Sequence, residues 1–82
     1  MKIPPLRPLH VTSALSQAKL NHYARLTTED LKRSLEPGQP GSLKTRPDGT
    51  IIDGHHRIDV LRTRGIEVDH LPREIVFRKH VR

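Results

Sequence analysis

The chain has 82 residues, of which only 33% are apolar, so we expect one small domain whose modest core a partner or dimerisation would have to support. It contains no cysteine, which excludes disulfides, thiolate catalysis and thiolate zinc sites and favours a cytoplasmic location. No apolar run approaches the ~20 residues of a membrane span, and the net charge of +6 favours anionic partners such as nucleotides, nucleic acid or an acidic protein.

The first ten residues predict an extended N-terminal arm, because prolines at positions 4, 5 and 8 oppose regular structure. The domain proper is then expected from 11 to 82. Good helix formers from 13 to 26 predict a first helix, which Ser13 is placed to cap. Its weak apolar stripe consists of Leu15, Leu20, Tyr23 and Leu26.

A second helix is predicted in the segment TTEDLKRSLEPG. Thr27 and Asp30 have the spacing of a capping box, with Asp in place of Glu or Gln. Leu31 and Leu35 lie one turn apart and should face the core. The Pro-Gly pair at 37–38 ends the helix, and a loop rich in glycine and proline follows.

The segment SLKTRPDGTIID predicts a β-hairpin, because it has apolar residues on both sides of a turn signal. Asp48 and Gly49 form a favoured two-residue turn. On the return strand the adjacent residues Ile51 and Ile52 are both apolar, which favours a strand that is covered on both faces.

A third helix is expected from about 55 to 64, with Gly65 at the position of a C-cap glycine. The segment from 66 to 77 predicts a last strand, with Pro72 at an edge or a bend. The predicted order is thus helix, helix, strand, strand, helix, strand. We expect a small single α+β domain in which the helices pack on a short mixed sheet.

The candidate site lies where the hairpin meets the third helix. Gly54 precedes this helix, and His55, His56 and Arg57 occupy its first turn. The N-terminus of a helix carries unpaired backbone N–H groups and a positive potential, so cations placed there oppose the dipole. A bound anion would explain this choice, and we therefore predict a phosphate site at residues 54–57.

Arg57 falls within the arc of the third helix that is predicted to be buried. A guanidinium at the edge of a core needs an anion or a carboxylate beside it. Two interpretations stay open at this point, a bound phosphate and a buried salt bridge. The carboxylates available for such a bridge are Asp53, Glu67 and Asp69.

His55 and Asp59 lie one turn apart on another side of the same helix. Asp59 is placed to orient His55 as a general base, so these two are the candidate catalytic residues, and a solvated pair is the alternative. His56 is expected on the outer face, where it reaches a ligand if the loop after Pro37 folds over the site.

The run LKTRPDGTIIDGHHRIDVLRTRG resembles the N-terminal domain of the ParB family and its structural relatives, the sulfiredoxins. ParB domains share the order helix, loop, hairpin, helix and strand, and carry Gly-Glu-Arg-Arg at the turn where sulfiredoxins carry Gly-Cys-His-Arg. Here the turn reads Gly-His-His-Arg. The resemblance covers roughly residues 27 to 76 and implies a fold of the ParB/sulfiredoxin type.

This resemblance implies a nucleotide site at the turn, since ParB proteins bind and hydrolyse CTP there and sulfiredoxins bind ATP. The implied ligand is ATP or CTP, accompanied by Mg²⁺. Gly54 would allow close approach of the ligand, and Arg57 would hold its phosphates. His56 matches the sulfiredoxin histidine, and His55 stands at the reactive position. Gln39 matches the end of the ligand-facing loop of ParB proteins.

The chain departs from both families at the reactive position, since it has neither the sulfiredoxin cysteine nor the ParB glutamate. Nucleotide hydrolysis, phosphotransfer and enzymatic activity in general are therefore left open. Two other functions also stay open. One is a DNA-binding or metal-dependent nuclease domain with Asp53, His55 and His56 as metal ligands. The other is a basic, non-enzymatic protein that binds a partner through its charged surface.

Overall fold

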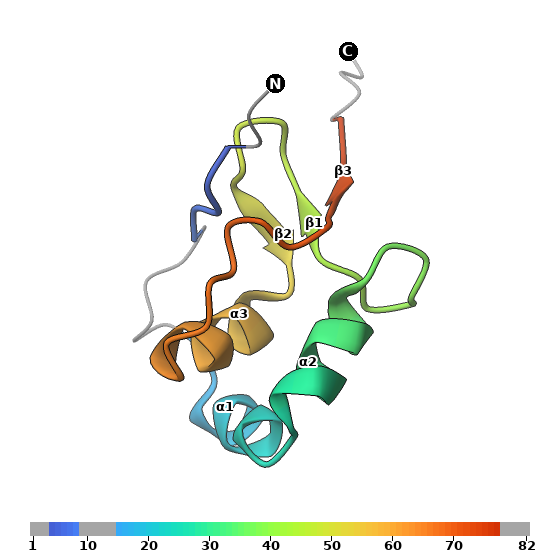
Figure 1. Ribbon diagram of the computed structural model, residues 1–82. Coiled ribbons are helices and arrows are strands. Elements are labelled where there is room, and N and C mark those ends of the chain that lie inside the picture. Colours follow the sequence, from blue (N-terminus) through green and yellow to red (C-terminus); the bar gives the residue numbers. More distant parts are fainter. Residues whose placement is uncertain (1–3, 9–14, 78–82) are drawn as a thin grey trace.

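The computed structural model describes residues 4–8 and 15–77. Its elements, in chain order, are α1 (Gln17–Ala24), α2 (Thr28–Leu35), β1 (Lys44–Thr45), β2 (Ile51–Asp53), α3 (His55–Thr63) and β3 (Glu74–Ile75). The strands form one sheet in the order β2-β1-β3, in which β1 is antiparallel to β2 and parallel to β3. The predicted α+β class and mixed sheet are confirmed, and Figure 1 shows the helices together beneath the sheet. None of the described helices is long and apolar enough to cross a membrane.

Side-chain caps define where the first two helices begin. The hydroxyl of Ser16 accepts a hydrogen bond from the backbone N–H of Lys19 (3.3 Å), so α1 starts later than predicted and Ser16 is its N-cap. The expected cap, Ser13, lies outside the described residues. In α2 the hydroxyl of Thr27 accepts from the N–H of Asp30 (3.0 Å), which confirms the predicted cap.

The hairpin turn differs from the prediction by one residue. The backbone N–H of Gly49 donates to the carbonyl of Arg46 (2.9 Å), so Pro47 and Asp48 are the central residues and the predicted Asp-Gly turn is wrong. Pro47 has the fixed φ that suits the second position of such a turn. The Asp48 carboxylate accepts from the N–H of Thr50 (2.9 Å), and Gly49 takes the left-handed conformation that follows (φ +93°).

The sheet is smaller and more open than predicted. Ile51 is 1% exposed but Ile52 is 41% exposed, so β2 is covered on one face only and the prediction of two covered faces is wrong. The helices supply cover for a single face of the sheet, as in many mixed α+β domains. The last strand is also shorter than predicted, because only two residues after Pro72 pair with β1.

Glycines with positive φ occupy both ends of α3. Gly54 is the N-cap residue, with φ +110°. At the other end Gly65 (φ +79°) donates its N–H to the carbonyl of Arg62 (2.9 Å), and Ile66 donates to Leu61 (3.0 Å). This pair of bonds is a Schellman motif, which confirms the predicted C-cap glycine.

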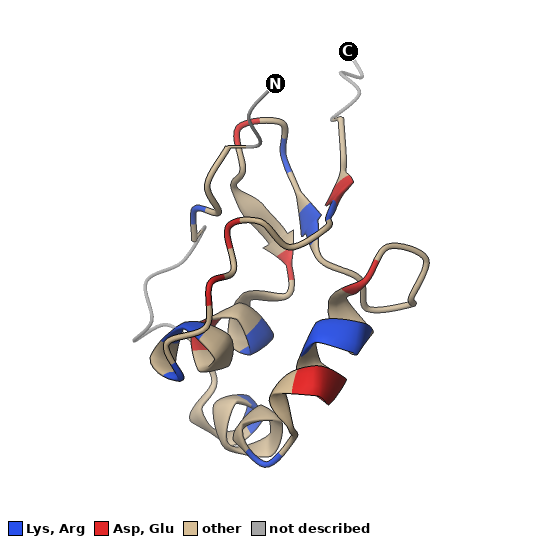
Figure 2. Cartoon of the chain, viewed as in Figure 1, with Lys and Arg blue, Asp and Glu red and all other residues tan. Residues whose placement is uncertain are grey.

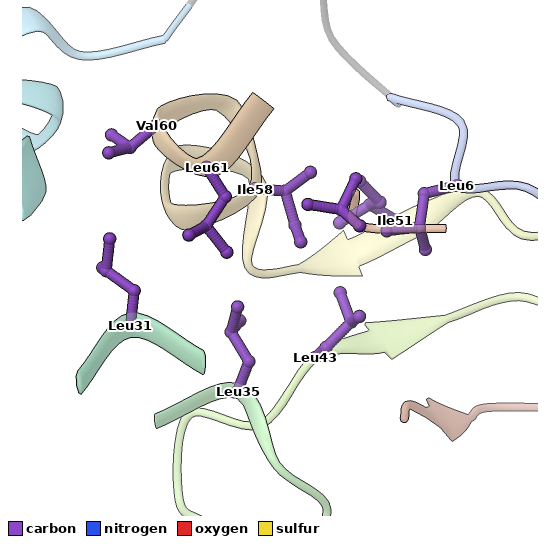
Figure 3. Packing of buried hydrophobic residues seen from close by; sticks show 9 residues of the cluster. Leu6, Leu31, Leu35, Leu43, Ile51, Ile58, Val60 and Leu61 are labelled. Atoms are coloured by element: carbon purple, nitrogen blue, oxygen red, sulfur yellow. The ribbon is translucent and has the colours of Figure 1, made fainter. Parts of the chain in front are cut away.

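The core is a single cluster of nine buried apolar side chains: Leu6, Leu31, Leu35, Leu43, Ile51, Ile58, Val60, Leu61 and Val68. Figure 3 shows the leucines of α2 pointing toward the apolar face of α3, as the spacing of both helices predicted. The end of the sheet closes the cluster, so the start of α3 lies at the junction of both layers.

Residues 4–8, within the predicted arm, are extended and pack directly on the domain. Arg7 pairs in parallel with Thr50, and its backbone N–H and carbonyl bond to Gly49 (2.9 Å) and Ile51 (2.8 Å). Leu6 is only 4% exposed and belongs to the core. This part of the arm therefore acts as an added strand along the outer side of β2.

Replacing Leu6 by Ala should lower the free energy of unfolding by about 2–4 kcal/mol, because it removes a buried side chain from a small core. Urea denaturation followed by circular dichroism measures the change. The exposed neighbour Arg7 engages the domain through its backbone, so Arg7→Ala should change the free energy by less than about 0.5 kcal/mol. Equal effects of the two substitutions would contradict a core role for Leu6.

Candidate functional site

The Arg57 side chain lies at the centre of the three helices and is only 8% exposed. Its Nη1 donates to the carbonyl (3.2 Å) and the hydroxyl (3.1 Å) of Ser34, in the last turn of α2. Its guanidinium also lies over the ring of Tyr23 in α1, with the central carbon 5.7 Å from the ring centroid. A cation at the C-terminal end of α2 is favoured by the helix dipole, so Arg57 joins all three helices.

No carboxylate neutralises this guanidinium within the described part of the chain. The predicted buried salt bridge is therefore wrong. Each of its three candidate partners faces another basic residue: Asp69 faces Arg62 (3.3 Å), Asp53 faces Lys44 (4.0 Å) and Glu67 faces the imidazole of His70 (3.9 Å). Among the described residues, the charge of Arg57 is met only by neutral oxygens and an aromatic ring.

The loop between α2 and β1 passes directly beside Arg57. A Cβ added to Gly41 would lie 3.4 Å from both terminal nitrogens of the guanidinium, so a side chain here would be in van der Waals contact with it. The Gly41 backbone is not left-handed, so its conformation does not require glycine. Sequence reasoning named the exposed Gln39 in this loop and missed Gly41, because nothing local indicates which side chain a loop glycine will meet.

A carboxylate from β3 holds this loop in place. One oxygen of Glu74 accepts hydrogen bonds from the backbone N–H of Gly38 (2.9 Å) and the hydroxyl of Ser42 (2.7 Å). These two bonds lower the pKa of Glu74 from its usual value, and the charge of Lys44 acts in the same direction. Glu74 therefore stays ionised and fixes both ends of the segment that contains Gly41.

Packing and backbone conformation both require a glycine at position 54. A Cβ at this position would lie 3.1 Å from Leu35 and 3.3 Å from Leu43, and the left-handed backbone also requires glycine. The core contacts alone account for glycine here, and the predicted close approach of a ligand stays a prediction. Because Gly54 has no side chain, α3 begins without a side-chain cap, and its first turn contains no acidic residue. The positive end of the helix dipole is thus not offset there.

His56 packs against the start of α1 and not on the outer face predicted for it. Its Nε2 accepts a hydrogen bond from the backbone N–H of Ser16 (3.2 Å), and its ring centroid lies 6.4 Å from that of Tyr23. Burial lowers the pKa of His56, and the nearby charge of Lys19 lowers it further. A neutral imidazole is needed to accept this bond, so His56 contributes no positive charge at neutral pH.

His55 and Asp59, the predicted catalytic pair, share one side of α3 as expected. Both line a small pocket of about 50 Å³. The rest of its lining comes from the arm, α3 and nearby segments: Pro8, Leu15, Ile51, Ile58 and Arg62. This lining does not include Arg57, which contacts α1 and α2 instead. The structure therefore places His55, the predicted base, and Arg57, the residue predicted to bind phosphate, at different positions around the helix.

The metal site of the nuclease interpretation finds no support in the described ranges, 4–8 and 15–77. No three His, Cys, Asp or Glu side chains there come close enough to hold a metal ion. Of the predicted ligands, Asp53 faces Lys44, and His56 uses its Nε2 to accept from Ser16.

Much of the positive charge has a structural role. Four arginines donate to backbone carbonyls: Arg57 to Ser34, Arg62 to Leu6 (3.0 Å), Arg64 to Ala24 (3.0 Å) and Leu26 (2.6 Å), and Arg73 to Pro4 (2.8 Å) and Asp69 (2.7 Å). Figure 2 shows basic positions on helices and sheet alike, with acidic ones between them. The net charge is thus weaker support for a nucleic-acid surface than the composition alone indicated.

Comparisons of the chain with protein-family models, with curated proteins and with solved structures found no match. The function therefore has to follow from the geometry of the site.

Lowering the pH should destabilise the protein partly through His56. Its folded-state pKa lies below the ordinary value of 6.5, so its contribution to stability is present above that pH and is lost as the pH falls through the folded pKa. In thermal unfolding between pH 7.5 and 5.0, wild type should lose more stability than His56→Gln. The exposed His22 provides the matched control, and His22→Gln should keep the wild-type slope. Parallel slopes for all three proteins would contradict the role of His56.

Proposed function

We propose that this domain binds the phosphate groups of a nucleotide at Arg57, beside the N-terminus of α3 and the loop that contains Gly41. The observation that carries the proposal is a guanidinium more than nine-tenths buried with no acidic partner among the described residues. A buried charge without a counter-charge is costly, and proteins keep one chiefly where a ligand supplies the opposite charge.

The donors of Arg57 also suit a phosphate. A guanidinium has five N–H bonds, and Ser34 takes up Nη1 alone. Among the described contacts, Nη2 and Nε donate to no oxygen, which leaves two parallel donors of the kind that phosphates accept. The uncapped start of α3 adds favourable potential for an anion.

The resemblance to ParB domains and sulfiredoxins supports the same site and the choice of ligand. The order helix, loop, hairpin, helix and strand is present, with Arg57 in the first turn of α3. On this basis we propose a domain of the ParB/sulfiredoxin type with ATP or CTP as ligand, together with Mg²⁺. Since His55 and Asp59 lie around the helix from Arg57, we propose binding, and leave turnover to be tested once a ligand is known.

A thermal-shift series with inorganic phosphate, ATP, CTP and GTP, each with and without Mg²⁺, tests this proposal. A short DNA duplex serves as the nucleic-acid arm. A ligand that binds only the folded state stabilises that state by about 2.7 kcal/mol when its concentration is about 100 times its dissociation constant. We therefore expect at least one nucleotide to raise the melting temperature by several degrees, and more than the DNA does.

The Arg57→Ala variant should lose this ligand-induced shift, although its melting temperature without ligand will also fall because the bonds to Ser34 are lost. The matched control is Arg25→Ala, which removes the same charge from an exposed position and should keep the shift. Ser34→Ala, which leaves the guanidinium in place, should keep it as well. An equal shift in Arg57→Ala and wild type, or no shift with any nucleotide, would refute the proposal.

A further inference from the structure

The two edges of the sheet differ in whether a described segment pairs with the outer side of the edge strand. At the β2 edge the arm supplies a covering strand, through the bonds between Arg7 and its neighbours Gly49 and Ile51. At the other edge, β3 pairs with β1 on its inner side, and no described residue pairs with its outer side. An uncovered edge strand is a template for pairing with another chain.

The hydrogen bonds of this strand fix which groups point outward. The N–H groups of Glu74 and Val76 donate to Leu43 (2.9 Å) and Thr45 (2.8 Å) of the neighbouring chain segment. Successive residues of a strand direct their N–H and carbonyl groups to opposite sides. Those of Ile75 are therefore directed away from β1, toward the open edge, and an extended chain that continues beyond β3 would direct those of Phe77 the same way.

The side chains along this edge are apolar and exposed. Ile75, Val76 and Phe77 are 45%, 39% and 72% exposed, and they account for three of the four large exposed hydrophobic residues in the described ranges. Ile75 stands opposite Thr45, which is fully buried, and so extends the core-facing side of the sheet. In an extended chain Phe77, two residues on, would lie on the same side.

We infer that a second copy of this chain pairs with β3 in antiparallel orientation, with the two-fold axis at Val76. In this register Ile75 forms a hydrogen-bonded pair with the partner's Phe77, and the symmetric pair forms on the other side of the axis. All the outward-directed backbone groups of Ile75 and Phe77 are then used. The two sheets join into one, which is an isologous contact.

The side chains favour this register. An axis at Ile75 would set Phe77 against the partner's Arg73. With the axis at Val76, Ile75 and Phe77 face apolar residues of the partner. The segment IVF is thus complementary to itself when two copies run in opposite directions.

This contact is short, so the dimer should be weak. Interfaces below about 1,200 Å² in total belong to weak or transient complexes. Sedimentation equilibrium of the wild-type protein, without nucleotide, should therefore show a monomer at low concentration and a growing dimer fraction between about 10 µM and 1 mM. Nothing in this contact involves Arg57, so the outcome is independent of ligand binding.

Two substitutions test whether association depends on the β3 edge or on any exposed apolar residue. Phe77→Lys should raise the dissociation constant by about tenfold or more, because it loses both Ile–Phe pairs of the dimer. Ile52→Lys changes an exposed apolar residue on β2, away from this edge, and should leave association unchanged. Circular dichroism verifies that both variants are folded. A wild-type protein that stays monomeric at 1 mM, or a dimer that only Ile52→Lys disrupts, would overturn the inference.

Engineered cysteines test the register, since the chain has no cysteine of its own. Val76 would form a non-hydrogen-bonded pair with its own copy, at a Cα separation of about 4.5 Å that a disulfide can bridge. In a glutathione buffer, Val76→Cys should form a disulfide-linked dimer at least about fivefold faster than Ile75→Cys. A mixture of Ile75→Cys and Phe77→Cys should yield the mixed dimer preferentially. Equal rates for Val76→Cys and Ile75→Cys would rule out the proposed axis.

Discussion

The position of the Arg57 guanidinium constrains the arrangement of all three helices. It lies over Tyr23 from α1 and donates to Ser34 from α2, while its own backbone belongs to α3. A chain with one Phe, one Tyr and no Trp has few large side chains with which to fix the positions of its helices relative to one another. Directional hydrogen bonds from arginine to carbonyl oxygens do this instead, and Arg64 adds a second link between α3 and the end of α1.

Features set by local spacing could be predicted from the sequence. The cap at Thr27 and the glycine at position 65 follow from a few neighbouring residues, because helix termini need specific partners within one turn. Helical periodicity also placed Arg57 in the buried arc, and the structure confirms that burial. The mixed sheet followed from the order of the elements.

Features that depend on distant partners could not be predicted. Arg57 meets Ser34 across 23 residues of sequence, and its contact with Gly41 depends on how Glu74 holds the loop. No spacing rule identifies which carbonyl a long arginine side chain will reach. The same limit explains why His56 was expected on the outer face of its helix, since its partner is the backbone of a residue 40 positions away.

The cover that residues 4–8 give to β2 has a consequence for the order of folding. The N–H of Leu6 bonds to Asp69, 63 residues later, and the carbonyl of Pro4 accepts from Arg73, 69 residues later. Residues 4–8 can therefore complete these contacts only after the segment from 69 to 73, which is synthesised later, has become available. Such non-local closure slows folding and delays protection from proteases until nearly the whole domain has left the ribosome.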